Sequence, residues 1–145
     1  MTATRIVVTG AGGFIGHHLV SYLKRQGYWV RGVDIKRPEY AETDADEFLL
    51  LDLSLRENCF EATKDVDQVY ALAADMGGMG YISSHHAHIL YTNALINFHT
   101  IEAARQQGVK RYLYTSSACV YPEYRQMEAD ISPLKEEDAF PAHPQ

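Results

Sequence analysis

The sequence predicts an α/β fold in which a doubly wound parallel sheet carries helices on both faces. Three observations support this prediction. Short runs rich in β-branched and aromatic residues alternate with stretches of helical periodicity. A glycine-rich turn joins the first run to the first helix. The later runs end in small or polar residues, at the edge where such sheets bind ligands. With 145 residues, the chain can bury one sizeable core.

The composition is that of an ordinary globular protein, with 46% hydrophobic and 22% charged residues. The formal net charge of −6 argues against nucleic acid or an anionic membrane as a partner. No apolar run is long enough to span a membrane, and the N-terminus has no basic-then-apolar signal segment. Cys59 is expected to be a core thiol, and with Cys119 it makes neither a disulfide framework nor a metal cluster, which favours a cytoplasmic protein.

The first turn is the strongest feature of the sequence. The run over residues 6–8 predicts a buried strand, and the spacing Gly10-x-x-Gly13-x-x-Gly16 follows it. A helical pattern then runs to Gly27, which suits a helix C-cap. This arrangement binds phosphate, because glycine admits a diphosphate to the backbone and the helix N-terminus presents unpaired N–H groups. Its context disfavours the alternative of a turn without a ligand. The predicted contacts are Gly10, Gly13, Phe14, Ile15 and Gly16.

A second strand over residues 28–34 ends in Asp34. A carboxylate about 20 residues after the glycine turn can accept hydrogen bonds from both ribose hydroxyls of the adenosine half of NAD. It would also repel the 2′-phosphate of NADP. Lys36 and Arg37 weaken that discrimination, and the alternative is a solvated acid at a strand end. The spacing favours NAD as the cofactor.

The third strand covers residues 48–51 and is followed by Asp52 and Leu53. Asp52 could meet the adenine edge of the same ligand. Equally, Asp52 or Ser54 could cap the next helix, which is predicted over residues 55–64. The sequence leaves both readings open.

A fourth strand over residues 66–73 ends in small residues, over which a cofactor could pass close to the backbone. The predicted cofactor contacts are Leu72, Ala73 and Ala74. The glycine-rich loop 75–80 follows, beyond the carboxyl end of the strand, where ligands bind in open α/β sheets. The alternative is a plain flexible connection. The predicted substrate contacts are Met76, Gly77, Gly78 and Met79.

A long helix is predicted over residues 84–107. Three histidines lie near its start, without the cysteine or carboxylate that would complete a metal site, so a polar helix start and no metal are expected. Asn93 and Asn97 share one face of this helix, where one is expected to support the site and the other to pack. Asn93 is the predicted cofactor contact.

The fifth strand covers residues 110–115 and runs into Ser117 and Cys119. Hydroxyls and a thiol at the carboxyl end of a strand are placed for chemistry. Residues 123–145 are acidic and proline-rich and predict an extended segment. The expected organisation is therefore a dinucleotide-binding portion over 1–122 and a tail over 123–145.

These motifs resemble the extended short-chain dehydrogenase/reductase family of NAD-dependent epimerases and dehydratases. The family's Thr-Gly-x-x-Gly-x-x-Gly turn stands at residues 9–16, and its acid after the second strand matches Asp34. Its Asp-Leu pair after the third strand matches residues 52–53, and its Ser-Ser-x-x-Val-Tyr stretch matches residues 116–121. The resemblance covers nearly the whole chain. It implies a Rossmann-type sheet with strand order 3-2-1-4-5.

Within that family, the Met-Gly-Gly-Met-Gly run at 76–80 resembles a subgroup that epimerises GDP-mannose at C3 and C5. There, oxidation at C4 acidifies the neighbouring hydrogens, a cysteine and a lysine exchange protons, and the sugar is reduced again. The resemblance implies that Cys119 is that cysteine and that Ser117 bonds the reacting oxygen. The alternative for Cys119 is a buried spectator thiol. The implied partners are a nucleotide sugar, with GDP-mannose favoured, and a second copy of the chain, since relatives usually dimerise through such a helix.

One feature of the family is missing. None of the ten tyrosines is followed by lysine at the fourth position, so the family's Tyr-x-x-x-Lys pair is absent. The chain is therefore expected to be an N-terminal portion of a longer enzyme, inactive by itself. The alternatives are another NAD-dependent sugar-nucleotide epimerase, dehydratase or reductase, and a non-catalytic NAD-binding module.

Overall fold

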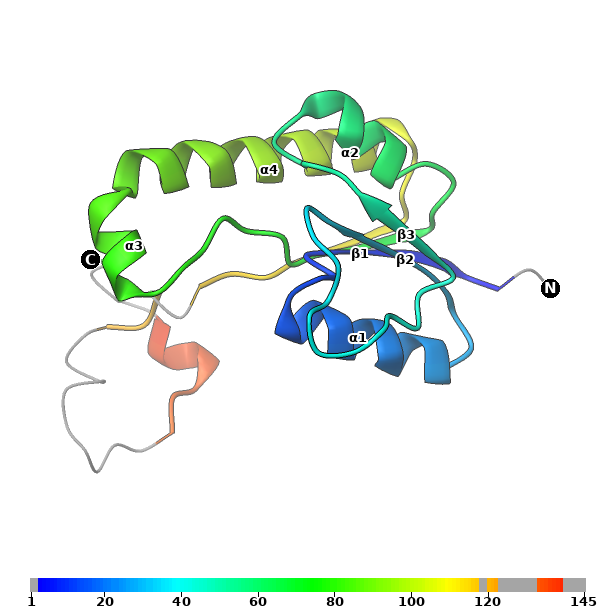
Figure 1. The fold of residues 1–145 in the computed structure, drawn as a ribbon, viewed down its shortest axis with the longest axis horizontal. Coiled ribbons are helices and arrows are strands. Elements are labelled where there is room, and N and C mark those ends of the chain that lie inside the picture. The colour runs from blue at the N-terminus through cyan, green and yellow to red at the C-terminus, as the bar shows by residue number, and fades with distance from the viewer. Residues whose placement is uncertain (1–2, 118–119, 123–132, 140–145) are drawn as a thin grey trace. The chain divides into compact units, whose positions relative to one another are not determined.

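The computed structural model describes residues 3–117, 120–122 and 133–139 (Figure 1). The chain divides into two compact units, Met1–Tyr114 and Thr115–Gln145, and each is described by itself. Within the described residues, no helix is both long and apolar enough to cross a membrane.

The first unit contains a five-stranded parallel sheet in the order β3-β2-β1-β4-β5, which confirms the predicted fold class and strand order. The strands are β1 (Arg5–Thr9), β2 (Trp29–Asp34), β3 (Glu47–Leu50), β4 (Gln68–Ala71) and β5 (Arg111–Tyr114). The last residue of β1, Thr9, lies opposite Val33 of β2 and Ala71 of β4. The carboxyl ends of these central strands therefore meet at one edge of the sheet.

Helices cover both faces of this sheet (Figure 1). Helix α1 (Phe14–Arg25) lies on one face, and α2 (Arg56–Ala62) and α4 (His86–Gln106) lie on the other. A short helix, α3 (Met79–Ser84), precedes α4. The two-sided cover explains why β1 and β4 carry consecutive apolar residues, 6–8 and 69–71, instead of alternating with polar ones.

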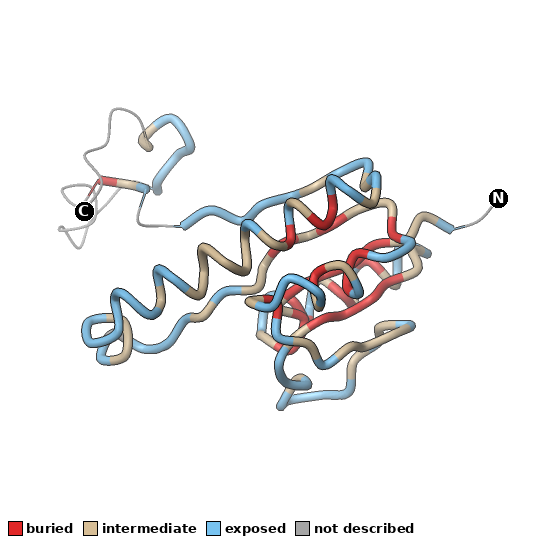
Figure 2. The backbone as a smooth tube through the Cα atoms, turned by 90° about the horizontal axis from the view of Figure 1, so that it is seen from above, coloured by how far each residue is buried: buried red, intermediate tan, exposed pale blue. Residues whose placement is uncertain are grey.

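The buried residues form two cores, because successive side chains of a strand point to opposite faces of the sheet. Ile6 and Val8 of β1 pack with α1, whereas Val7 packs on the opposite face with residues of α2 and α4. Figure 2 shows this burial along the central strands and along the sides of the helices that face them. Cys59 of α2 is fully buried in the second core, which confirms the prediction of a core thiol.

Helix α1 ends as its sequence predicts. Gly27 has a φ of +83°, and its N–H donates to the carbonyl of Lys24 over 3.0 Å. The N–H of Tyr28 reaches back to the carbonyl of Leu23 over 3.3 Å. This left-handed turn satisfies the last carbonyls of the helix and directs the chain into β2.

The long helix predicted over residues 84–107 is present as α4, which begins at His86 and ends at Gln106. The short helix α3 before it was not predicted, and the two are separated at His85, whose φ of −127° and ψ of 29° are not helical. The Ser84 hydroxyl donates to the carbonyl of Gly80 over 2.6 Å, and the His85 ring stacks on Tyr81 with centroids 4.5 Å apart. Side chains that bond to the local backbone or pack on it compete with the continuation of the helix. The predicted loop 75–80 is correspondingly shorter, because its last two residues are helical.

In the second unit, residues 136–139 form one turn of 3-10 helix, η3 (Glu136–Ala139), where the sequence predicts an extended chain. Asp138 explains the turn. Its carboxylate accepts the N–H of Lys135 over 2.9 Å, and its own N–H donates to the carbonyl of Lys135 over 2.9 Å. Aspartate commonly stabilises turns through such contacts with the local backbone.

A buried arginine links three elements of the first unit. The Arg31 guanidinium on β2 donates to the Glu47 carboxylate on β3 over 2.7 Å. It also donates to the carbonyls of Ala62 and Lys64, at the end of α2, over 2.9 and 2.7 Å. The guanidinium of Arg5 lies 3.4 Å from the centre of the Trp29 ring, and that of Arg31 lies 5.3 Å from it. Arg31 therefore satisfies carbonyls that a helix end leaves without partners.

Candidate functional site

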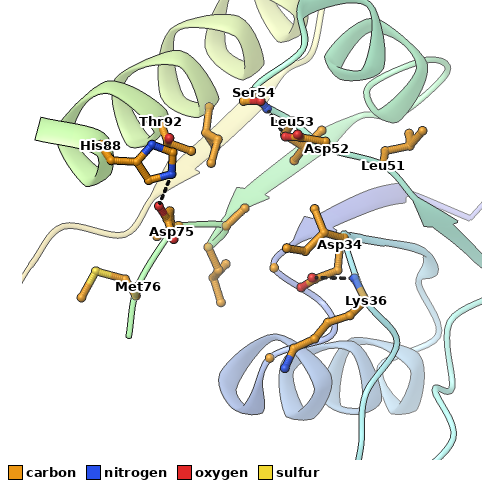
Figure 3. Close-up of a pocket in the computed structure, with 17 residues that line it drawn as sticks. Asp34, Lys36, Leu51, Asp52, Leu53, Ser54, Asp75, Met76, His88 and Thr92 are labelled. Carbon is orange, nitrogen blue, oxygen red and sulfur yellow. Dashed lines mark hydrogen bonds and ion pairs between the residues drawn. The ribbon is translucent and has the colours of Figure 1, made fainter. Parts of the chain in front are cut away.

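A cavity of about 560 Å³ lies at the carboxyl ends of β1 to β4, beside α4 (Figure 3). It is formed by the segments that follow each of these strands and by one face of the helix. Its lining residues are Gly10, Gly13, Asp34, Ile35, Lys36, Leu51, Asp52, Leu53, Ser54, Leu72, Ala73, Ala74, Asp75, Met76, His88, Thr92 and Ile96. Open α/β sheets bind ligands in such a crevice, at the point where the connections of the central strands diverge to opposite faces.

The glycine turn is packed so closely that side chains would not fit. Gly10 has a φ of +69°, and a Cβ there would lie 2.9 Å from the backbone of Leu72 and Ala73. A Cβ on Gly16 would overlap the carbonyl oxygen of Gly10. Gly13 differs from both, because within 4 Å a Cβ would meet only the Gly10 carbonyl oxygen, at 3.3 Å. Gly10 and Gly16 are therefore required by the fold, whereas Gly13 keeps the cavity open.

The N-terminus of α1 adjoins the cavity at Gly13. Gly13 is the N-cap of this helix and provides no side-chain cap, and its carbonyl accepts the N–H of His17 over 2.9 Å. The preceding N–H groups of the first turn have no carbonyl one turn earlier to bond. Phe14 and Ile15 expose about 70% of their surface. The first turn can thus present several N–H groups and the positive end of the helix dipole to an anion.

Asp34 lies at the end of β2, beside this turn. Its carboxylate accepts the N–H of Gly12 over 2.9 Å and the N–H of Lys36 over 3.1 Å, and it lines the cavity. These two bonds hold it in place for a ligand hydroxyl. The sequence interpretation gave Gly12 no role, although a Cβ there would overlap the Lys36 carbonyl and approach the Asp34 carboxylate. The signal was Gly12 itself, a glycine directly before Gly13 that the Gly-x-x-Gly-x-x-Gly spacing does not require.

The two cations after Asp34 have partners of their own. The Lys36 ammonium bonds the Glu39 carboxylate over 2.7 Å, which raises the pKa of Lys36 and lowers that of Glu39. The guanidinium of Arg37 lies 5.3 Å from the centre of the Phe48 ring. Neither contact occupies the Asp34 carboxylate, which lines the cavity together with Lys36.

Asp52 and Leu53 follow β3 and form another part of the wall. The Asp52 carboxylate accepts the N–H of Ser54 over 2.8 Å, and the N-cap of α2 is Leu55, which has no side-chain cap. Asp52 therefore stabilises the turn before the helix without capping the helix itself. Leu53 is only 4% exposed and its side chain belongs to the core, so it can offer a ligand mainly its backbone.

Thr9 fixes the segment that follows β4. Its hydroxyl oxygen accepts the N–H groups of Leu72 and Ala73 over 3.1 and 3.0 Å, and the residue is 1% exposed. The sequence interpretation placed Thr9 at the end of a strand and at the start of the family's glycine motif, and assigned it no contact. The contact spans more than 60 residues, so no local pattern predicts it. It holds Leu72 and Ala73 against Gly10 and keeps this wall of the cavity in place.

Asp75 is held by residues of α3 and α4. Its N–H donates to the side-chain oxygen of Asn93 over 2.7 Å, and the Asn93 amide donates back to its carbonyl over 3.0 Å. Its carboxylate accepts the Tyr81 hydroxyl at 3.2 Å and lies 3.6 Å from Nε2 of His88. Burial, followed by the Asp75 charge, raises the pKa of Tyr81, which keeps that hydroxyl a donor. Asn93 thus acts on the loop backbone and is not among the residues that line the cavity.

The remaining predicted site residues are distributed unevenly. Of the predicted substrate loop, Met76 lines the cavity, whereas a Cβ on Gly77 would lie 2.7 Å from the Tyr81 ring and Gly78 is the N-cap of α3. Ser117 belongs to the second unit, where its carbonyl accepts the N–H of Val120 over 3.2 Å. Cys119 lies outside the described residues.

Among the described residues, no group of three or more histidine, cysteine, aspartate or glutamate side chains could hold a metal ion. The thiol of Cys59 donates to the carbonyl of Leu53 over 3.2 Å, and burial raises its pKa. A buried thiol with a raised pKa is a poor nucleophile and a poor metal ligand.

Comparison with known proteins places this geometry in context. A model of the NAD dependent epimerase/dehydratase family matches residues 6–144. The chain is 52% identical over 143 residues to the GDP-mannose 3,5-epimerase of Arabidopsis thaliana, covering 97% of this chain and 38% of that protein. The chain therefore spans well under half the length of this relative.

Two solved structures share the fold. A UDP-galactose 4-epimerase superimposes with a TM-score of 0.77 and 32% identity, over 97% of this chain and 45% of that one. A short-chain dehydrogenase/reductase superfamily protein from Agrobacterium tumefaciens, with bound NAD, gives a TM-score of 0.75 and 26% identity, over 97% and 39% of the two chains.

Proposed function

Because the chain belongs to the NAD-dependent epimerase/dehydratase family, we propose that it is the NAD-binding portion of a nucleotide-sugar epimerase that acts on GDP-mannose. The observation that carries the proposal is the cavity at the carboxyl ends of β1 to β4, where a glycine turn without side chains adjoins a helix N-terminus. The identity with the plant enzyme supports GDP-mannose as the substrate.

The residues present fit NAD. The cradle at Gly10, Gly13 and Gly16 leaves room at the helix N-terminus for a diphosphate, since a Cβ at Gly13 would meet only the Gly10 carbonyl oxygen within 4 Å. Asp34, held by two backbone N–H groups, would accept the ribose hydroxyls of the adenosine half, and Asp52 with Leu53 would border the adenine. Leu72, Ala73 and Ala74 would let the ligand pass close to the backbone. Asn93 would act through the loop backbone that it holds.

NAD, when bound, would supply oxidation of the sugar at C4 and its reversal. The ketone so formed would acidify the hydrogens on C3 and C5, and Cys119 would exchange a proton there. A thiol suits this task because its pKa lies nearer to neutrality than that of a hydroxyl. Ser117 would donate a hydrogen bond to the reacting oxygen, and Met76 to Met79 would contact the sugar. These roles rest on the family resemblance and on the identity with the plant enzyme.

The experiment that tests the proposal has a binding arm and a catalytic arm. Calorimetry on this chain should detect NAD, with NADP binding more weakly because Asp34 repels the 2′-phosphate. Residues 1–145 should give no epimerised product, since they contain no Tyr-x-x-x-Lys pair. The absence of heat with either dinucleotide would contradict the proposal, and so would turnover of GDP-mannose by this chain alone.

In a longer protein that contains the Tyr-x-x-x-Lys pair, replacing Cys119 with alanine should preserve oxidation at C4 and stop proton exchange at C3 and C5. Deuterium incorporation from heavy water, followed by NMR of the sugar, measures the exchange directly. Undiminished deuterium incorporation in the alanine variant would show that Cys119 takes no part in the proton exchange.

A second candidate is an epimerase of another nucleotide sugar, which the similarity to a UDP-galactose 4-epimerase favours. Incubation of the longer protein with GDP-mannose and with UDP-galactose, followed by separation of the products, distinguishes the two. Formation of the C4 epimer of the UDP-sugar alone would support the second candidate.

We also propose a homodimer formed through α4. One face of this helix carries large apolar side chains that are 52–73% exposed: Leu90, Tyr91, Phe98 and Ile101. They recur at helical spacing, and such a stripe on a soluble protein marks a contact surface. Sedimentation that shows only monomers of the longer protein at micromolar concentration would contradict a dimer.

A further inference from the structure

The cavity contains a pair of ionisable side chains to which neither the family motifs nor the proposed chemistry assigns a role. Asp75 follows β4 and His88 belongs to the first turn of α4, and both line the cavity. Figure 3 shows them facing each other, with Nε2 of His88 3.6 Å from the Asp75 carboxylate. At 3.6 Å the distance is too long for a hydrogen bond, and the two groups form an ion pair only when the imidazole is protonated. The donor of His88 is therefore available to a ligand.

The order of the strands tells which part of a dinucleotide this pair would meet. Asp34 ends β2, on one side of the glycine turn, and Asp75 follows β4, on the other side. Gly10 packs directly against the backbone that leads to Asp75. A ligand with its adenosine at Asp34 and its first phosphate at α1 would therefore extend its second phosphate towards Asp75 and His88.

The charge of the lining shows why His88 matters there. The cavity wall carries the carboxylates of Asp34, Asp52 and Asp75, and its basic side chains are Lys36 and His88. The Lys36 ammonium is bound to Glu39, on the Asp34 side. A second phosphate would thus lie beside the Asp75 carboxylate, and His88 is the basic lining side chain on that side; Thr92, the next lining residue of α4, offers a hydroxyl without a charge.

Asp75 is well suited to orient the imidazole. Asn93 holds its backbone through two hydrogen bonds, of 2.7 and 3.0 Å, and the Tyr81 hydroxyl donates to its carboxylate. Its side chain is 24% exposed, compared with 62% for that of His88. The carboxylate is therefore held in place by its hydrogen bonds and can orient the more exposed imidazole.

We propose that His88 contacts the diphosphate of NAD by donating a hydrogen bond to it, and that Asp75 positions the imidazole for this contact. The proposal rests on the proposed function, because it assigns one more residue to the same cavity. The chemistry it requires is an anionic phosphate oxygen and an N–H donor. Hydrogen bonds of this kind, with one charged partner, are stronger than those between neutral groups.

The test compares ligands that share adenosine but differ beyond it. Calorimetry on this chain would measure the Kd of NAD, ADP and AMP for the unaltered protein, for His88→Leu and for His88→Lys. His86→Leu is the matched control, since His86 is an exposed histidine of the same helix that does not line the cavity. Removing a charge-assisted hydrogen bond at a partly exposed site should weaken NAD and ADP about tenfold in His88→Leu. AMP binding should change by less than about twofold, because AMP lacks the second phosphate.

The lysine variant should restore most of the affinity for NAD and ADP, and His86→Leu should leave all three Kd values unchanged. Equal losses for AMP and ADP, or a loss for NAD alone, would overturn the contact with the diphosphate. Unchanged affinities in His88→Leu would overturn the inference and leave the proposed function intact. Failure of the unaltered chain to bind NAD would overturn the proposed function and this inference together.

Discussion

Replacing Gly13 with valine is expected to abolish measurable NAD binding and to leave the fold intact. Gly13 has a φ of −79° and a ψ of 169°, which valine adopts readily, and its Cβ would meet only one protein atom within 4 Å. The added side chain would occupy the space of the diphosphate at the helix N-terminus. A loss of roughly 100-fold or more in affinity corresponds to about 3 kcal/mol, the scale of several lost N–H contacts.

Calorimetry for NAD and circular dichroism for the fold measure the two parts of this expectation separately. Gly13→Ala should be intermediate in affinity, because its side chain is smaller. Gly16→Val is the contrasting variant: its Cβ would overlap the Gly10 carbonyl, so it should fail to fold. If Gly13→Val bound NAD with unchanged affinity, the glycine turn would not be part of the binding site. If that variant unfolded, the structure would not accommodate a side chain at Gly13.

The second large effect concerns stability. Replacing Arg31 with methionine, which keeps much of the volume, is expected to lower the free energy of unfolding by about 3 kcal/mol. The reason is that the carbonyls of Ala62 and Lys64 lose their donor and the Glu47 carboxylate loses its partner. For a domain of this size, the change corresponds to a fall in Tm of roughly 10 °C.

Thermal unfolding followed by circular dichroism measures this effect. The matched control is Arg105→Met, which removes a two-point contact with Glu102 on the exposed surface of α4, where water screens the charges. Its Tm should stay close to that of the unaltered chain. Equal melting temperatures for the Arg31 and Arg105 variants would show that burial of the guanidinium contributes nothing to stability.

The sheet could be predicted because its determinants are local. Apolar runs of strand length and helical spacing recur along the chain, and Gly27 closes α1 through a backbone conformation that glycine favours. The break at His85 could not be predicted. It depends on the Tyr81–His85 stack and on the Ser84 hydroxyl, and neither changes the periodicity of the apolar residues.

The residues of the candidate site likewise fall into those that the sequence predicted and those that it did not. Asp34, Asp52 and residues 72–74 were predicted because each lies at or just after the end of a strand, and all of them line the cavity. Their contact with NAD stays a prediction. Thr9 and His88 were passed over as site residues because their roles depend on partners far along the chain or on where α4 lies against the sheet. Site residues were missed because their partners are distant in the sequence, more than because of their residue type.

Trp29, whose ring contacts the guanidinium of Arg5, has a practical consequence for the experiments above. It is the single tryptophan of the chain and begins β2, so it lies at the amino edge of the sheet, whereas the cavity lies at the carboxyl edge. Its emission should therefore follow the melting of the sheet and respond little to a dinucleotide at the far edge. The protein thus carries an intrinsic optical reporter of unfolding, against which losses of affinity can be separated from losses of structure.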